Sequence, residues 1–163
     1  MFIHGGSWRN GRKDDYGFAG AALAALGFLT AIPNYRLAPE VRFPTFIEDC
    51  AAALRWVQDN AAAYGGDPSR IVIAGRSAGA YNTMMLALDP RYLMGAGVDA
   101  SAVKGVVGLA GPYDFYPFDV AATQDAFAGA PDPTLTQPIY FARADAPPLL
   151  FGLGSGRHRS GAA

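Results

Sequence analysis

A serine with a glycine two residues away on each side is the part of this chain best suited to chemistry. Residues 75–79 read Gly-Arg-Ser-Ala-Gly, and they directly follow residues 71–74, a short β-branched run typical of a parallel strand that is buried on both faces. The following segment is apolar and helical in character. This context predicts a sharp strand-to-helix turn that places the Ser77 hydroxyl above a sheet and at a helix N-terminus. The expected chemistry is nucleophilic attack on an acyl carbonyl, and the alternative is an ordinary glycine-serine turn.

A second loop, at residues 4–8, reads His-Gly-Gly-Ser-Trp and follows the apolar pair Phe2-Ile3. Glycines let the backbone approach a ligand closely. The N–H groups of Gly5 and Gly6, together with that of Ala78, can therefore point at the oxyanion that forms when the serine attacks. His4 could in principle serve as a general base. We favour the interpretation that it orders the loop by hydrogen bonding.

The elements that must position these two loops alternate between strands and helices. We expect helices over residues 16–26, ending at Gly27, over 45–64 and over 78–88, with two short helices within the Pro-rich segment 114–141. We expect strands at residues 2–3, 28–32, 71–74, 103–109 and 149–151. This alternation predicts an α/β fold with a mostly parallel sheet flanked by helices.

Together the two loops resemble the α/β-hydrolase superfamily. The match is closest to the esterase/lipase branch that includes hormone-sensitive-lipase-like enzymes, carbohydrate esterases and kynurenine-formamidase-like proteins. Four further segments carry the resemblance, namely residues 34–40 (Asn-Tyr-Arg-Leu-Ala-Pro-Glu), 43–44 (Phe-Pro), 65–70 (Gly-Gly-Asp-Pro-Ser-Arg) and 111–114 (Gly-Pro-Tyr-Asp). Ala80, where lipase-like members usually have glycine, is more similar to the formamidase-like and carbohydrate-esterase members. The resemblance covers about residues 1–151.

The resemblance implies a serine hydrolase of carboxylic esters that works through an acyl-enzyme on Ser77. Gly5, Gly6 and Ala78 would form the oxyanion hole. Trp8 and Tyr81 are the expected walls of the substrate pocket, with core packing as the equal alternative. The expected partner is a small-molecule ester or related acyl compound, and no metal or other cofactor is implied. Formamidase-like amide hydrolysis is the alternative chemistry by ancestry.

A general base for the serine is harder to find. In this superfamily an Asp or Glu and then a His follow the serine along the chain. After Ser77 the only histidine is His158, in a Gly-rich polar tail, and the last acidic residue is Asp145, before the final expected strand. We therefore expect an α/β-hydrolase core over residues 1–151 that is incomplete at its N- and C-termini. Residues 152–163 would be a disordered or frameshifted tail, and the alternative function is an inactive hydrolase remnant.

Composition excludes several other classes. Hydrophobic residues make up 51% of the 163-residue chain and charged residues 17%, which is typical of a folded domain rather than of disorder. The formal net charge of −1 favours neither nucleic acid nor an anionic membrane as partner. Cys50, the only cysteine, cannot form an internal disulfide or a cysteine-rich zinc site, and we expect it in the core. With no recognisable signal peptide or membrane span, we expect a cytoplasmic protein and leave its oligomeric state open.

Overall fold

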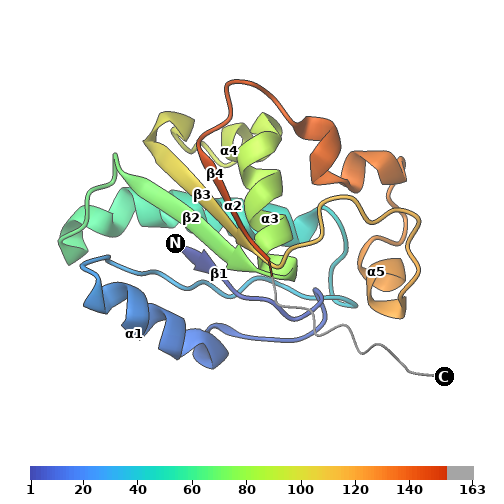
Figure 1. Ribbon diagram of the computed structural model, residues 1–163, viewed down its shortest axis with the longest axis horizontal. Coiled ribbons are helices and arrows are strands. Elements are labelled where there is room, and N and C mark those ends of the chain that lie inside the picture. Colours follow the sequence, from blue (N-terminus) through green and yellow to red (C-terminus); the bar gives the residue numbers. More distant parts are fainter. Residues whose placement is uncertain (154–163) are drawn as a thin grey trace.

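The computed structural model describes residues 1–153, and its centre is a parallel sheet of four strands (Figure 1). The strands lie in the order β1-β2-β3-β4, which confirms the predicted α/β class. Their bounds are Phe2–Ile3 for β1, Ile71–Arg76 for β2, Val103–Leu109 for β3 and Leu149–Gly152 for β4. Residues 154–163 lie outside the described part, so the predicted boundary between core and tail at residue 151 stays a prediction.

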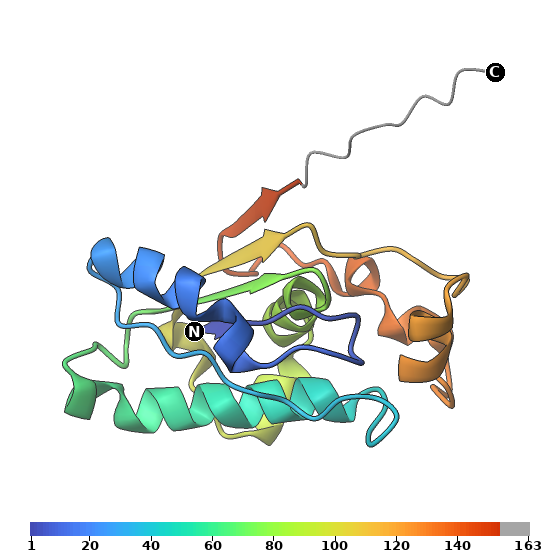
Figure 2. The ribbon, with the colours of Figure 1, turned by 90° about the horizontal axis from the view of Figure 1, so that it is seen from below.

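Helices lie on both sides of this sheet. The longest is α2 (Thr45–Asn60), and α3 (Ala78–Leu88) and α4 (Pro90–Gly95) lie on the same side as α2. On the opposite side of the strands runs α1 (Gly17–Ala25), as Figure 2 shows. The remaining elements are a short helix, α5 (Ala121–Ala126), and five 3-10 turns, η1 (Lys13–Tyr16), η2 (Ala61–Tyr64), η3 (Ala100–Ala102), η4 (Pro133–Thr136) and η5 (Pro138–Phe141).

Helix α3, which begins directly after Ser77, is the centre of the packing. All eleven of its residues are buried, and it contacts β1, β2 and β3. Helix α2 turns an apolar face toward α3, on which Ile47, Ala51 and Leu54 are buried. The side of the sheet facing α1 is more open: none of the α1 residues is buried, and Val72 on β2 is 38% exposed. β2 is therefore buried on one face only, not on both as we expected.

The predicted strand at residues 28–32 is wrong. The structure has no strand there and shows one ladder-like hydrogen bond, from the Phe2 N–H to the Ala31 carbonyl oxygen at 2.8 Å. Phe28 and Leu29 stay half-exposed, and Pro33 ends the segment without an N–H to donate. β-branched and aromatic residues favour a strand only where a neighbouring strand supplies a continuous ladder. Helix α4 was also missed, although Asp89 caps it and Pro90 opens it as helix starts commonly do.

Candidate active site

Ser77 occupies the turn between β2 and α3 in a backbone conformation that is rare for a residue with a side chain. Its φ is 53° and its ψ is −120°. Its N–H donates to the Leu109 carbonyl oxygen at 2.8 Å, and its own carbonyl accepts from the Tyr81 N–H at 3.1 Å. Such a backbone costs about 1–3 kcal/mol and persists only where its surroundings enforce it. Here β3 on one side and the first turn of α3 on the other hold the serine in the predicted sharp turn.

Gly75 and Gly79, on either side of Ser77, are required because other backbone segments approach them too closely to leave room for a side chain. A Cβ on Gly75 would lie 2.7 Å from Thr83 Oγ1 and would collide with the Gly79 carbonyl. A Cβ on Gly79 would lie 2.7 Å from the Ile3 carbonyl carbon and collide with the carbonyl oxygens of Ile3 and His4. The absence of these side chains lets the start of α3 sit directly against the end of β1. The first loop is thereby brought next to Ser77.

The first loop reverses direction through three successive residues with positive φ. These values are 135° at Gly6, 53° at Ser7 and 57° at Trp8. The Gly6 carbonyl accepts from the N–H groups of Arg9 and Asn10 at 3.0 and 2.9 Å. The Trp8 carbonyl accepts from the Ala38 N–H at 2.8 Å. The loop is thus closed on itself and tied to the segment that carries the Tyr-Arg-Leu-Ala-Pro-Glu sequence.

The predicted oxyanion donors differ in their hydrogen bonding. The Gly5 N–H donates to the Tyr16 hydroxyl at 3.1 Å. Within residues 1–153, the N–H groups of Gly6, Ser7 and Ala78 donate to no acceptor. Gly5 nevertheless lies close to Ser77, since a Cβ on it would be 3.3 Å from Ser77 Cβ and 2.7 Å from the Arg76 carbonyl oxygen. The arrangement offers unpaired backbone donors beside the serine, which is what stabilisation of an oxyanion requires.

His4 is buried and bonds its own loop. Its Nδ1 lies 2.9 Å from the Gly5 carbonyl oxygen, and its ring stacks on Tyr35 at 4.3 Å between centroids. Burial lowers the pKa of His4, while the bond to Gly5 acts in the opposite direction. The neutral ring therefore donates from Nδ1, and Nε2 has no hydrogen-bond partner in the described chain. These contacts agree with the interpretation that His4 orders the loop.

Trp8 and Tyr81 both lie in a buried aromatic cluster. Their ring centroids are 5.2 Å apart in an edge-to-face arrangement, and Phe127 packs edge-on against both rings. The Tyr81 hydroxyl donates to the Thr136 carbonyl oxygen at 2.7 Å. The Trp8 indole Nε1–H donates to Asn82 Oδ1 at 3.1 Å. The rings therefore occupy core positions, and their assignment as pocket walls stays a prediction.

Two site residues escaped the sequence reasoning. Tyr16 holds the Gly5 N–H from the end of η1, and nothing in its own sequence neighbourhood indicates this contact. Asn82 is buried at 0% exposure in α3. The sequence does indicate that Asn82 is engaged, because an amide in an otherwise almost wholly apolar helix must find a hydrogen-bond partner.

No base for Ser77 is found in the described part of the chain. Ser77 Oγ makes no hydrogen bond with any of residues 1–153. Asp145 is exposed and pairs with Arg143 at 2.9 Å, and His158 lies outside the described residues. Within the same range, no three His, Cys, Asp or Glu residues cluster as a metal site would require. No described helix is long and apolar enough to cross a membrane.

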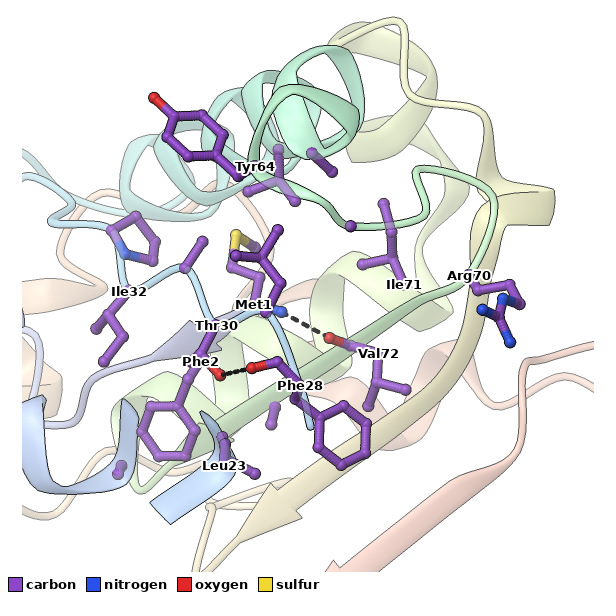
Figure 3. A pocket seen from close by; sticks show the side chains of 18 of the residues that line it. Met1, Phe2, Leu23, Phe28, Thr30, Ile32, Tyr64, Arg70, Ile71 and Val72 are labelled. Atoms are coloured by element: carbon purple, nitrogen blue, oxygen red, sulfur yellow. Dashed lines mark hydrogen bonds between the residues drawn. The ribbon is translucent and has the colours of Figure 1, made fainter. Parts of the chain in front are cut away.

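A large cavity lies away from the serine. It has a volume of about 1340 Å³, and α1, η2, β1 and β2 surround it. Its lining is mostly apolar, with Leu23, Phe28 and Ile71 among the side chains drawn in Figure 3. Neither Ser77 nor any predicted oxyanion donor lines it. This cavity is therefore separate from the candidate active site.

Comparison with known proteins gives a consistent result. The family model described as BD-FAE matches residues 1–155. The carboxylesterase NlhH of Mycobacterium tuberculosis is 48% identical over 80 residues, which cover 48% of this chain and 25% of that protein. Esterase LipC of the same organism is 37% identical over 121 residues, which cover 71% of this chain and 30% of that protein.

A solved structure extends the comparison to most of the chain. Esterase 2 of Thermogutta terrifontis superimposes with a TM-score of 0.74 at 21% identity, covering 92% of this chain and 57% of that chain. This likeness shows a shared fold. The chain matches less than two thirds of the length of each of these three proteins.

Proposed function

Because the chain belongs to the BD-FAE family, an esterase branch of the α/β-hydrolases, and has part of that fold, we propose that it is a serine hydrolase of carboxylic esters. One observation carries the proposal: Ser77 stands in a strained turn at the start of α3, beside backbone N–H groups that have no acceptor within residues 1–153. A nucleophile and oxyanion donors in one place are the two groups that acyl transfer needs. The relatives NlhH and LipC are named as a carboxylesterase and an esterase, which supports the same reaction class.

The proposed reaction has two steps. Ser77 Oγ attacks the ester carbonyl carbon, the proton of the Ser77 hydroxyl leaves with the departing alcohol, and an acyl-enzyme forms. Water then attacks the acyl carbon, releases the carboxylic acid and returns a proton to Ser77. Gly6 and Ala78 donate to the oxyanion in both steps, and Gly5 joins them only when its N–H leaves Tyr16.

For the substrate we propose small acyl esters. Esterase 2 of Thermogutta terrifontis, which has the same fold, has been observed with propionate and with butyrate bound. Formamidase-like amide hydrolysis is the alternative chemistry, and a matched pair of ester and anilide substrates with the same acyl group distinguishes the two.

A second candidate function rests on a specific observation. Ser77 Oγ has no hydrogen-bonded base among residues 1–153, as a non-catalytic remnant of the fold would also show. Removing a triad member typically lowers turnover by several orders of magnitude. We therefore expect little multiple turnover from this chain by itself. For this reason the test measures acylation of Ser77 and substrate turnover in two different assays.

The test is labelling of the purified chain with a fluorophosphonate probe, followed by hydrolysis of p-nitrophenyl butyrate. Labelling that Ser77→Ala abolishes and Ser101→Ala leaves intact supports the proposal; Ser101 is an exposed serine in η3. A chain that is folded by circular dichroism and is not labelled supports the non-catalytic candidate. Rapid turnover that depends on Ser77 would show that the chain holds a working base, contrary to our expectation.

A further inference from the structure

Asn82 connects the first loop to the helix that carries the nucleophile. It lies on α3, the helix that starts directly after Ser77, and its side chain is fully buried. Its Oδ1 accepts the indole N–H of Trp8 at 3.1 Å, and Trp8 itself is 3% exposed. No other side-chain hydrogen bond joins residues 4–12 to α3 in the described structure. This bond is therefore the directional link between the loop and the helix.

The other end of the Asn82 amide is also engaged. Its Nδ2 donates one of its two N–H groups to the Cys50 sulfur on α2 at 3.7 Å, which is a weak bond. Burying such a group is unfavourable unless it is paired, so a leucine would be the simpler choice at this position. The bond that Oδ1 accepts from Trp8 is the stronger of the two, so it is the one that orients the Trp8 ring.

The loop has reason to need such an anchor. Ser7 and Trp8 both have positive φ, a conformation that residues with side chains leave when nothing enforces it. The Ala38 N–H holds the Trp8 carbonyl at 2.8 Å, which fixes the backbone after the turn. The indole bond to Asn82 fixes the side chain at the same residue. Together they set where the free N–H groups of Gly6 and Ser7 point.

We infer that Asn82 is a positioning residue. By holding Trp8, it keeps the unpaired N–H of Gly6 at a fixed distance from the N–H of Ala78, which lies on the same helix as Asn82. The inference rests on the proposed function, because this spacing matters only if both groups bind an oxyanion. Misplacing such donors by about 1 Å can reduce a rate about 100-fold. The Asn82 amide touches no reacting atom, so its removal should lower the maximal rate and leave substrate affinity unchanged.

The experiment compares four variants. Asn82→Leu removes the acceptor at similar volume, and Trp8→Phe removes the donor and keeps an aromatic ring. Asn82→Asp retains an oxygen acceptor, since a buried carboxyl is neutralised by protonation. Cys50→Ala removes the other partner of the amide and serves as the control. For each we measure the maximal rate and the half-saturating concentration of Ser77 acylation by p-nitrophenyl acetate, from the released p-nitrophenol.

Asn82→Leu and Trp8→Phe should each lower the maximal acylation rate about 10-fold or more, with half-saturation unchanged within twofold. The double variant should be no slower than either single one, because both remove the same bond. Asn82→Asp should stay within about threefold of the wild type and Cys50→Ala within about twofold. Independent, multiplying effects of Asn82→Leu and Trp8→Phe, or a wild-type rate for Asn82→Leu, would overturn the inference.

A second readout separates this inference from the proposed function. The rate of trypsin cleavage after Arg9 reports how readily the first loop opens. The rate of cleavage after Arg70, which is more exposed than Arg9 and lies directly before β2, is the internal reference. Asn82→Leu should raise the ratio of the two cleavage rates about 10-fold, and Cys50→Ala should not. If wild-type Ser77 cannot be acylated, the proposed function fails while the cleavage ratio still tests the anchor. An unchanged ratio in Asn82→Leu contradicts the inference whether or not the serine reacts.

Discussion

Adding one methyl group at Gly79 is expected to separate the two loops of the site. A Cβ there would lie 2.7 Å from the Ile3 carbonyl carbon, and closer still to the carbonyl oxygens of Ile3 and His4. Ordinary van der Waals contact begins at 3.4 Å. The obstructing atoms are backbone, and Ile3 is held in register with Gly75 of β2, so no side-chain rotation can relieve the contact. The start of α3 must therefore move away from β1.

The energetic consequence has two opposing parts. Overpacking a close contact costs about 1–3 kcal/mol, whereas replacing glycine by alanine in a helix gains up to about 1 kcal/mol. We expect Gly79→Ala to lower the free energy of unfolding by about 1–2 kcal/mol. Because the displaced turn carries Ser77, we expect fluorophosphonate labelling to slow by about 100-fold.

Gly95→Ala is the matched control. Gly95 is the last residue of α4, and a Cβ there would meet no atom within 4 Å. The same substitution should therefore raise the free energy of unfolding by about 0.5–1 kcal/mol, with labelling unchanged. Urea unfolding followed by circular dichroism measures the first quantity and the probe measures the second. A Gly79→Ala variant that matches Gly95→Ala in both stability and labelling would refute the close-approach argument.

Three further predictions concern single groups. Burial lowers the pKa of His4, so below about pH 6.5 the unfolded chain takes up a proton that the folded chain resists. The urea midpoint should fall from pH 7.5 to pH 5.5, and an equal fall in His4→Gln would contradict this. Tyr16→Phe leaves the buried Gly5 N–H without an acceptor and should cost about 1–3 kcal/mol in urea unfolding, whereas Tyr64→Phe, at an exposed residue, should cost nothing measurable. Burial raises the pKa of the Cys50 thiol, so Ellman's reagent should modify Cys50 only in urea, and rapid modification of the folded chain would be evidence against burial.

Much of the site was predictable because its local signals and its surroundings agree. The β-branched run of β2, the two glycines and the apolar helix α3 follow one another along the chain, and the structure shows the strand, turn and helix in that order. Two short-range signals failed. Residues 28–32 have strand-forming side chains but no continuous ladder, and β2 was expected to be covered on both faces. In both cases the outcome depends on neighbours that local sequence does not specify.

The hydrogen bonds that hold the first loop could not be predicted from the sequence, because they also depend on distant neighbours. Asn82 and Trp8 are 74 residues apart, and Gly5 and Tyr16 are joined through a hydroxyl whose direction depends on where η1 ends. Residue type indicates that a buried amide or phenol needs a partner. It does not indicate which partner, because the pairing is decided by the packing of α1, α2 and α3 around the loop.

The parallel sheet also has a consequence for how the molecule is made. The first residue of the chain bonds to Val72, 71 positions later, and Ser77 bonds to Leu109 on β3. Contacts of such high sequence separation form slowly, because a long chain segment must first be closed into a loop. A nascent chain that has emerged as far as α3 holds both loops of the site but not the carbonyl that fixes its serine. Until β3 arrives, the part of the α3 surface that packs on β3 stays exposed, so this is the interval in which chaperone binding or aggregation competes with folding.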